Sequence, residues 1–254
     1  MEALMNTEAL SALLTLTFLE IVLGIDNILF ISVVANKVDA HQRKKATQWG
    51  LLLAMLLRLG LLMGISVFLQ MQQTFFAVDN QFLSVALNGQ SIILAIGGIF
   101  LLYKSTKEIY EKVEGHSQHL INGQKNTYSF NRALVQIIAI NLVFSFDSIL
   151  TAIGMTNGLT GALPIMAIAV IVSVVIMMIF AKPVGEFINE HPSLQVLGLS
   201  FLLLIGFMLL AEAAHLSHLV IWDQAVGAVP KGYLYFAIAF SLGVEFLNMK
   251  VRKR

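Results

Sequence analysis

The chain has 254 residues, of which 57% are hydrophobic and only 12% are charged. Its mean hydropathy is +0.81, and about a quarter of the residues in a typical soluble domain carry charge. The composition therefore excludes an ordinary soluble domain and indicates a protein of the lipid bilayer. The formal net charge of +1 leaves no basic surplus for nucleic acid as a main partner. The absence of cysteine excludes disulfides and thiolate metal sites.

Seven apolar stretches are long enough to cross the hydrocarbon core as helices, which takes about 20 residues each. They lie at residues 9–34, 47–69, 85–103, 133–155, 163–181, 194–214 and 233–249. The first has no basic flank of the kind that precedes a cleavable signal peptide, so we expect it to stay in the membrane. The predicted fold is all-α: a polytopic membrane protein with seven transmembrane helices.

Basic residues are distributed unevenly between the two sides of the predicted helices. The loops after the first, third, fifth and seventh helices hold nearly all of them, and those on the opposite side hold only Lys231. Basic residues in short loops remain cytoplasmic, so the N-terminus is predicted to face outward and the C-terminus the cytoplasm. The polar stretch at 111–131 is then a cytoplasmic linker.

The first and fourth predicted helices contain related segments. EIVLGIDNILF begins at residue 20 and NLVFSFDSILT at residue 141, so that Asp26 aligns with Asp147 and Asn27 with Ser148. The third and sixth helices also match, as IGGIFLL from residue 96 and LIGFMLL from residue 204. An odd number of helix crossings separates the related segments, so the two copies run in opposite directions.

This pattern predicts an inverted repeat within a single membrane domain spanning 1–254. Repeat one covers 9–110, repeat two covers 132–215, and one extra helix at 232–249 follows. Inverted repeats of this kind are typical of secondary transporters, whose substrate site lies near the bilayer midplane between the halves.

Four charged residues lie well inside the predicted helices, Glu20, Asp26, Arg58 and Asp147, whereas Glu212 and Glu245 lie near helix ends. Each costs about 2.5–3.5 kcal/mol at the bilayer centre, so we expect them to face one another rather than lipid. Three carboxylates against one guanidinium leave a negative excess that a divalent cation would neutralise. The predicted metal ligands all supply oxygen, with Arg58 as a supporting charge: Glu20, Asp26, Asn27, Asn141, Asp147 and Ser148.

Oxygen donors suit Mg²⁺, Ca²⁺ and Mn²⁺, but they do not exclude a cationic amino acid as substrate. A purely structural alternative is a buried ion pair of Arg58 with Asp26 or Asp147, with no ion bound. The sequence has no phosphate-binding GxxxxGK[ST] loop and no combination of nucleophile, base and orienting residue. We therefore expect neither an ATP-driven transporter nor an enzyme, and no cofactor.

Several segments resemble the TerC family of integral membrane proteins, named for tellurium resistance: LEIVLGIDN, FSFDSI, HPS at 191–193 and VPKGYLYFA before the last helix. The resemblance covers nearly the whole chain and is closest to short members without appended cytoplasmic domains. It implies a multi-pass protein of the bacterial inner membrane, similar to the lysine-exporter superfamily, and for several relatives export of Mn²⁺. The acidic motifs of the family fall on Glu20, Asp26, Asn27, Asp147 and Ser148.

The expected function is therefore secondary transport that exports a divalent cation, with Mn²⁺ as the expected cargo, by alternating access. Exchange for protons is one coupling that the carboxylates would allow. Two alternatives stay open. One is an amino-acid exporter, and the other is a membrane partner protein, without transport activity, that acts in metal loading of secreted enzymes or in tellurium or stress resistance. The expected partners are the lipid bilayer and the transported ion; the sequence identifies no protein partner.

Overall fold

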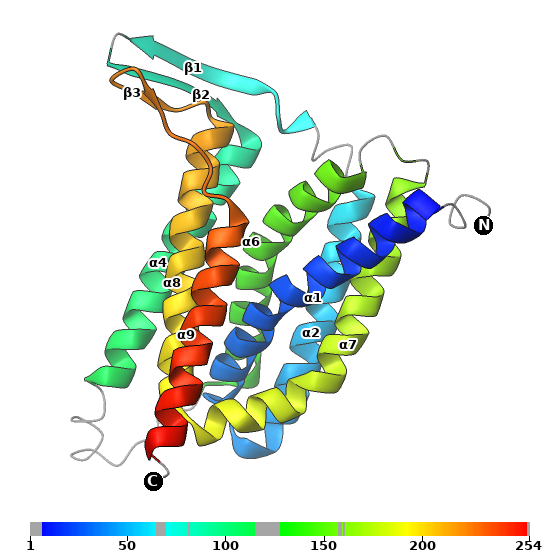
Figure 1. Cartoon of the computed structure of the whole chain (residues 1–254), viewed down its shortest axis with the longest axis vertical. Coiled ribbons are helices and arrows are strands. Elements are labelled where there is room, and N and C mark those ends of the chain that lie inside the picture. Colours follow the sequence, from blue (N-terminus) through cyan, green and yellow to red (C-terminus); the bar gives the residue numbers. More distant parts are fainter. Residues whose placement is uncertain are drawn as a thin grey trace. The chain divides into compact units, whose positions relative to one another are not determined.

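A computed structural model of the chain describes residues 7–64, 70–80, 82–114, 128–156, 159 and 161–252 (Figure 1). The described part is mostly helical, and each of the seven predicted apolar stretches overlaps a helix. These helices are α1 (Thr7–Ala35), α2 (Ala40–Met63), α4 (Gly89–Val113), α6 (Phe130–Thr156), α7 (Ala162–Glu190), α8 (Pro192–Leu216) and α9 (Lys231–Arg252). Five of them, α2, α6, α7, α8 and α9, are long and apolar enough to cross a membrane. Seven crossings in an inverted repeat stay a prediction.

The chain divides into two compact units that do not follow the order of the sequence. Unit 1 consists of Met1–Leu69 and Lys125–Glu190 and contains α1, α2, α6 and α7. Unit 2 consists of Gln70–Gln124 and His191–Arg254 and contains α4, α8, α9 and all four described strands. Each unit therefore takes helices from both predicted repeats.

Unit 2 contains a small antiparallel sheet, which the all-α prediction missed. Its strands, in sheet order, are β1 (Thr74–Asn80), β2 (Leu83–Asn88), β3 (Val220–Ile221) and β4 (Gln224–Ala225). The prediction that a helix begins at residue 85 was wrong, because residues 85–88 belong to β2. A short apolar run is ambiguous between strand and helix. The helix begins only after Asn88, whose side chain accepts from the Ser91 amide at 2.7 Å and completes a capping box.

Helix boundaries in the polar regions also differ from the predicted ones. α2 begins at Ala40 rather than at residue 47, and α7 continues through Pro183 to Glu190 rather than ending at residue 181. Charged residues at helical spacing extend α4 to Val113, which shortens the predicted linker at 111–131. Most of that linker lies outside the described residues.

The C-terminal end of the predicted linker is attached to unit 1 by Tyr128. Its amide donates to the Lys37 carbonyl at 2.7 Å, and its ring is in contact with two cations. Lys37 Nζ is 5.0 Å and Arg132 Cζ is 4.4 Å from the ring centroid. These contacts connect the end of α1 to the start of α6.

α4 and α8 pack closely in unit 2 through one glycine on each helix. A Cβ atom on Gly98 would lie 2.8 Å from the Gly206 carbonyl oxygen, and a Cβ on Gly206 would lie 3.1 Å from the Gly98 oxygen. These two glycines occupy equivalent places in the matching segments IGGIFLL and LIGFMLL. The contact is reciprocal, as a local two-fold axis requires.

Gly98→Leu tests this contact. We expect it to destabilise the protein by about 1–3 kcal/mol, because the new side chain overpacks the α4–α8 interface. The measurement is thermal or denaturant unfolding of the purified protein in detergent. Gly243→Leu on α9 is the matched control, since a Cβ there meets nothing within 4 Å. Equal stability of the two variants would argue against the close approach.

Candidate functional site

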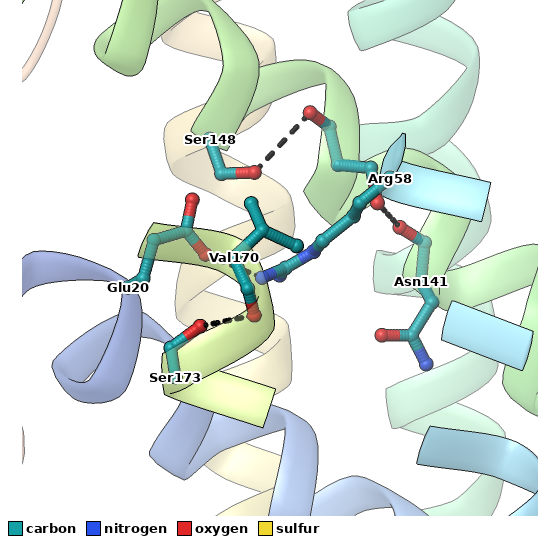
Figure 2. Close-up of polar contacts among 7 residues, drawn as sticks. Glu20, Arg58, Asn141, Ser148, Val170 and Ser173 are labelled. Atoms are coloured by element: carbon teal, nitrogen blue, oxygen red, sulfur yellow. Dashed lines mark hydrogen bonds and ion pairs between the residues drawn. The ribbon is translucent and has the colours of Figure 1, made fainter. Parts of the chain in front are cut away.

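Unit 1 contains a buried polar core in an otherwise apolar helix bundle. Its side chains come from all four helices of the unit and are between 0 and 3% exposed: Glu20 and Asn27 on α1, Arg58 on α2, Asn141, Ser145 and Ser148 on α6, and Ser173 on α7. In Figure 2, Glu20, Asn141, Ser148 and Ser173 lie around the Arg58 side chain. The structure thus places three of the six predicted ligands, Glu20, Asn141 and Ser148, around the supporting arginine, whereas Asn27 is buried on α1 seven residues after Glu20.

The Glu20 and Arg58 side chains form a salt bridge, with Arg58 Nη1 donating to Glu20 Oε2. Both side chains are 3% exposed, so this is a fully buried ion pair between α1 and α2. Arginine stays charged in proteins, and Glu20 supplies the carboxylate that its burial requires. The sequence interpretation treated Glu20 as a metal ligand and considered only the two aspartates as ion-pair partners.

Most of the small polar side chains around this pair bond back to their own helices. Ser145 Oγ donates to the Asn141 carbonyl at 2.6 Å, Asn141 Nδ2 to the Ile137 carbonyl at 2.9 Å, and Ser173 Oγ to the Val170 carbonyl at 2.9 Å. Such local bonds satisfy the donors of buried polar groups without fastening one helix to another. The serine oxygens retain lone pairs that can accept a further bond.

Two buried polar atoms of the core have no hydrogen-bond partner within the described part of the chain. They are Asn27 Oδ1, an acceptor, and Arg58 Nε, a donor. A buried amide oxygen without a partner costs about 1–3 kcal/mol. An oxygen of this kind is a ready ligand for a hard cation.

The structure describes the side chain of one predicted aspartate ligand, Asp147, but not that of the other, Asp26. Asp147 on α6 is half-buried, and its carbonyl accepts a hydrogen bond from Thr151 Oγ1 at 3.0 Å. Asp26 belongs to the continuous helix α1, but its side chain lies outside the described residues. Among the side chains that are described, no three His, Cys, Asp or Glu residues gather as a metal site. The predicted combination of Asp26 with Asp147 is therefore untested.

Gly24, on the same helix, approaches α7. A Cβ atom at Gly24 would lie 2.1 Å from Met177 Sδ, so the glycine makes room for the methionine side chain. α1 is helical without interruption from Thr7 to Ala35, so Gly24 mediates close packing and not local unwinding of the helix.

The sequence interpretation missed two residues of the polar core. Ser145 aligns with Gly24 in the repeat and was not predicted as part of the site, and Ser173 lies in the apolar run AVIVSVVIMM with no motif around it. An isolated serine in such a run is the only signal that could have identified Ser173.

The family comparison identifies the chain. A model of the integral membrane protein TerC family matches residues 5–254. The chain belongs to the TerC family.

Relatives of known sequence agree with this assignment. The chain is 40% identical to a UPF0053 protein of Haemophilus influenzae over 252 residues, which cover 99% of this chain and 98% of the relative. It is also 41% identical over 243 residues to the UPF0053 inner membrane protein YgdQ of Escherichia coli, covering 96% of this chain and 93% of the relative. The Escherichia coli inner membrane protein YoaE is 41% identical over 253 residues, but the match spans only 45% of YoaE. No solved structure matches the chain. This TerC family member is an integral membrane protein.

Neutralising one partner of the buried ion pair should destabilise this TerC protein strongly. We expect Glu20→Gln or Arg58→Gln to cost about 3–5 kcal/mol, because each leaves an uncompensated buried charge. The double variant should lose much less than the sum of the two single losses. Unfolding in detergent, measured as a double-mutant cycle, checks this.

The control is Glu186→Gln, which removes one partner of an exposed pair with Lys182, where the side chains are 64% and 72% exposed. Its effect should be close to zero. Additive losses in the double variant would contradict direct pairing of Glu20 with Arg58.

Proposed function

We propose that this TerC protein is a secondary transporter of the inner membrane that exports a divalent cation, with Mn²⁺ as its cargo. The inner-membrane location is carried over from the names of YgdQ and YoaE. Transport, and not catalysis, is the proposed activity. The observation that carries the proposal is a buried set of oxygen donors on two repeat-related segments of one unit, including Asn27 Oδ1 without a partner in the described residues.

The charges of the core support a cation rather than an anion. The Glu20–Arg58 pair is neutral as a whole. The carboxylates that remain in the related segments are Asp26 and Asp147, one from each repeat. Two carboxylates with nearby amide and hydroxyl oxygens match a hard divalent ion in charge and ligand type. We propose Asp26 and Asp147 as primary ligands, with Asn27, Asn141 and Ser148 as supporting donors.

Glu20 and Arg58 have a supporting part in this proposal. Because Arg58 holds only one oxygen of Glu20 in the described hydrogen bond, Glu20 Oε1 remains a candidate ligand or proton acceptor. The positive charge of Arg58 lowers the affinity of the core for a cation, which favours release of the ion.

The packing of the helices supports the inverted repeat that alternating access requires. In the predicted repeat, α1 is equivalent to α6 and α2 is equivalent to α7. The contact of α1 with α7 is then equivalent to the contact of α6 with α2, and both contacts occur in unit 1. In unit 2 the equivalent helices α4 and α8 pack on each other through equivalent glycines. Two halves related by an inverted repeat are expected to have such equivalent helix contacts.

The decisive experiment measures Mn²⁺ flux by the purified protein in liposomes. We expect Asp147→Asn to reduce flux to the level of protein-free liposomes, because the variant keeps the shape of the side chain and loses its charge. Asp26→Asn should do the same. Asp79→Asn, an exposed residue of β1, is the matched control and should transport at the wild-type rate.

Two outcomes would contradict the proposal. Wild-type flux by Asp26→Asn or by Asp147→Asn would exclude the substituted aspartate as a primary ligand. No Mn²⁺ flux by the wild-type protein under any gradient would favour a membrane partner protein, whereas lysine flux that competes with Mn²⁺ would favour an amino-acid exporter.

A further inference from the structure

Unit 1 contains a cavity that is separate from its polar core. It has a volume of about 270 Å³ and lies between the C-terminal end of α1, the first turns of α2 and the C-terminal half of α7. Typical small-molecule sites measure about 300–1,000 Å³, so the cavity suits a small polar group. None of the seven polar-core residues lines it.

The charged side chains of the cavity are mostly basic. Arg43 and Lys44 from α2 and Lys182 from α7 face one acidic residue, Glu186. Arg43 Nε donates to the Val38 carbonyl at 3.2 Å, which holds the guanidinium at the cavity with its remaining N–H groups available. Lys182 Nζ lies 3.8 Å from Glu186 Oε1, at the surface. The excess of positive charge disfavours a metal cation here and favours an anion.

Ser32 adds a neutral donor to the cavity. Its side chain lines the cavity, and the residue is 5% exposed. A Cβ atom on Gly185 would lie 2.8 Å from this oxygen, so the glycine leaves space for the hydroxyl. The hydroxyl can therefore donate a hydrogen bond to a group bound in the cavity.

The N-terminus of α2 adds backbone donors. Ala40, the first residue of this 24-residue helix, lines the cavity, and the preceding Asp39 makes no side-chain capping bond. The free amide groups and the positive end of the helix dipole attract anions, phosphate above all. A buried hydroxyl and three basic side chains thus line one small space beside the first residue of α2.

The neighbourhood of the cavity suggests a lipid as the source of the anion. α7 contains Pro183 within the helix, and α7 is bent in Figure 1. Just before it, Met178, Ile179 and Phe180 are exposed apolar side chains, and Met178 also lines the cavity. An acyl chain can lie along such a surface while its headgroup enters the basic space.

We propose that this cavity binds the phosphate group of an anionic phospholipid. Lys44, Lys182 and Arg43 supply the charge, Ser32 and the first turn of α2 supply hydrogen bonds, and the apolar face of α7 contacts the acyl chains. The proposal is independent of cation transport, because none of these residues belongs to the polar core.

The test counts bound lipid by native mass spectrometry. The purified full-length protein, freed of lipid in a non-ionic detergent, is titrated with phosphatidylglycerol and, separately, with phosphatidylcholine. We expect preferential binding of phosphatidylglycerol that weakens with ionic strength. The double variant Lys44→Gln/Lys182→Gln should bind it about tenfold more weakly, whereas Glu186→Gln should bind it more tightly.

The matched control is Lys45→Gln/Lys250→Gln, which removes the same charge from exposed residues that do not line the cavity. This control should bind phosphatidylglycerol like the wild type. Equal weakening in the control and the cavity variant would overturn the proposal, as would equal binding of the two lipids. Displacement of phosphatidylglycerol by an equal concentration of inorganic phosphate would overturn the assignment to lipid and identify a free anion as the ligand.

Discussion

The cost of placing Arg58 inside unit 1 governs the arrangement of the polar core. A guanidinium cannot give up its proton to escape burial, so it requires a carboxylate within reach. Glu20 is that carboxylate, and the bond between the two joins α1 to α2. The nearby serines and Asn141 satisfy their donors on their own helices and add oxygen atoms without adding charge. The core therefore combines one neutral ion pair with several weakly engaged oxygens, which is a suitable environment for an exchangeable cation.

Under the two proposals, separate parts of unit 1 would bind ions of opposite charge. The polar core offers carboxylate, amide and hydroxyl oxygens, whereas the cavity at the ends of α1 and α7 offers lysine, arginine and backbone amides. A lipid phosphate in the cavity would neutralise basic charge that otherwise repels an approaching cation. The two proposals concern different residues, so either can fail without the other.

The helices could be predicted because uninterrupted apolar length is a strong signal, and the depth of Glu20, Asn27 and Arg58 followed from their position within it. The sheet could not be predicted, since TFFAVDN and LSVALN are short apolar runs that also fit the start of a helix. The choice of Glu20 as the partner of Arg58 depends on how α1 packs on α2, which no motif encodes. Likewise, α7 continues through Pro183, although a proline inside a helix usually kinks or ends it.

The order in which the two units occur along the chain has a consequence for biosynthesis. α4 ends at Val113, but α8, the helix against which it packs, begins only at Pro192. All of α6 and α7 must leave the ribosome in between, and these complete the other unit. The glycine face of α4 therefore stays without its partner until translation supplies α8. Neither unit can be obtained as a single continuous fragment of the gene.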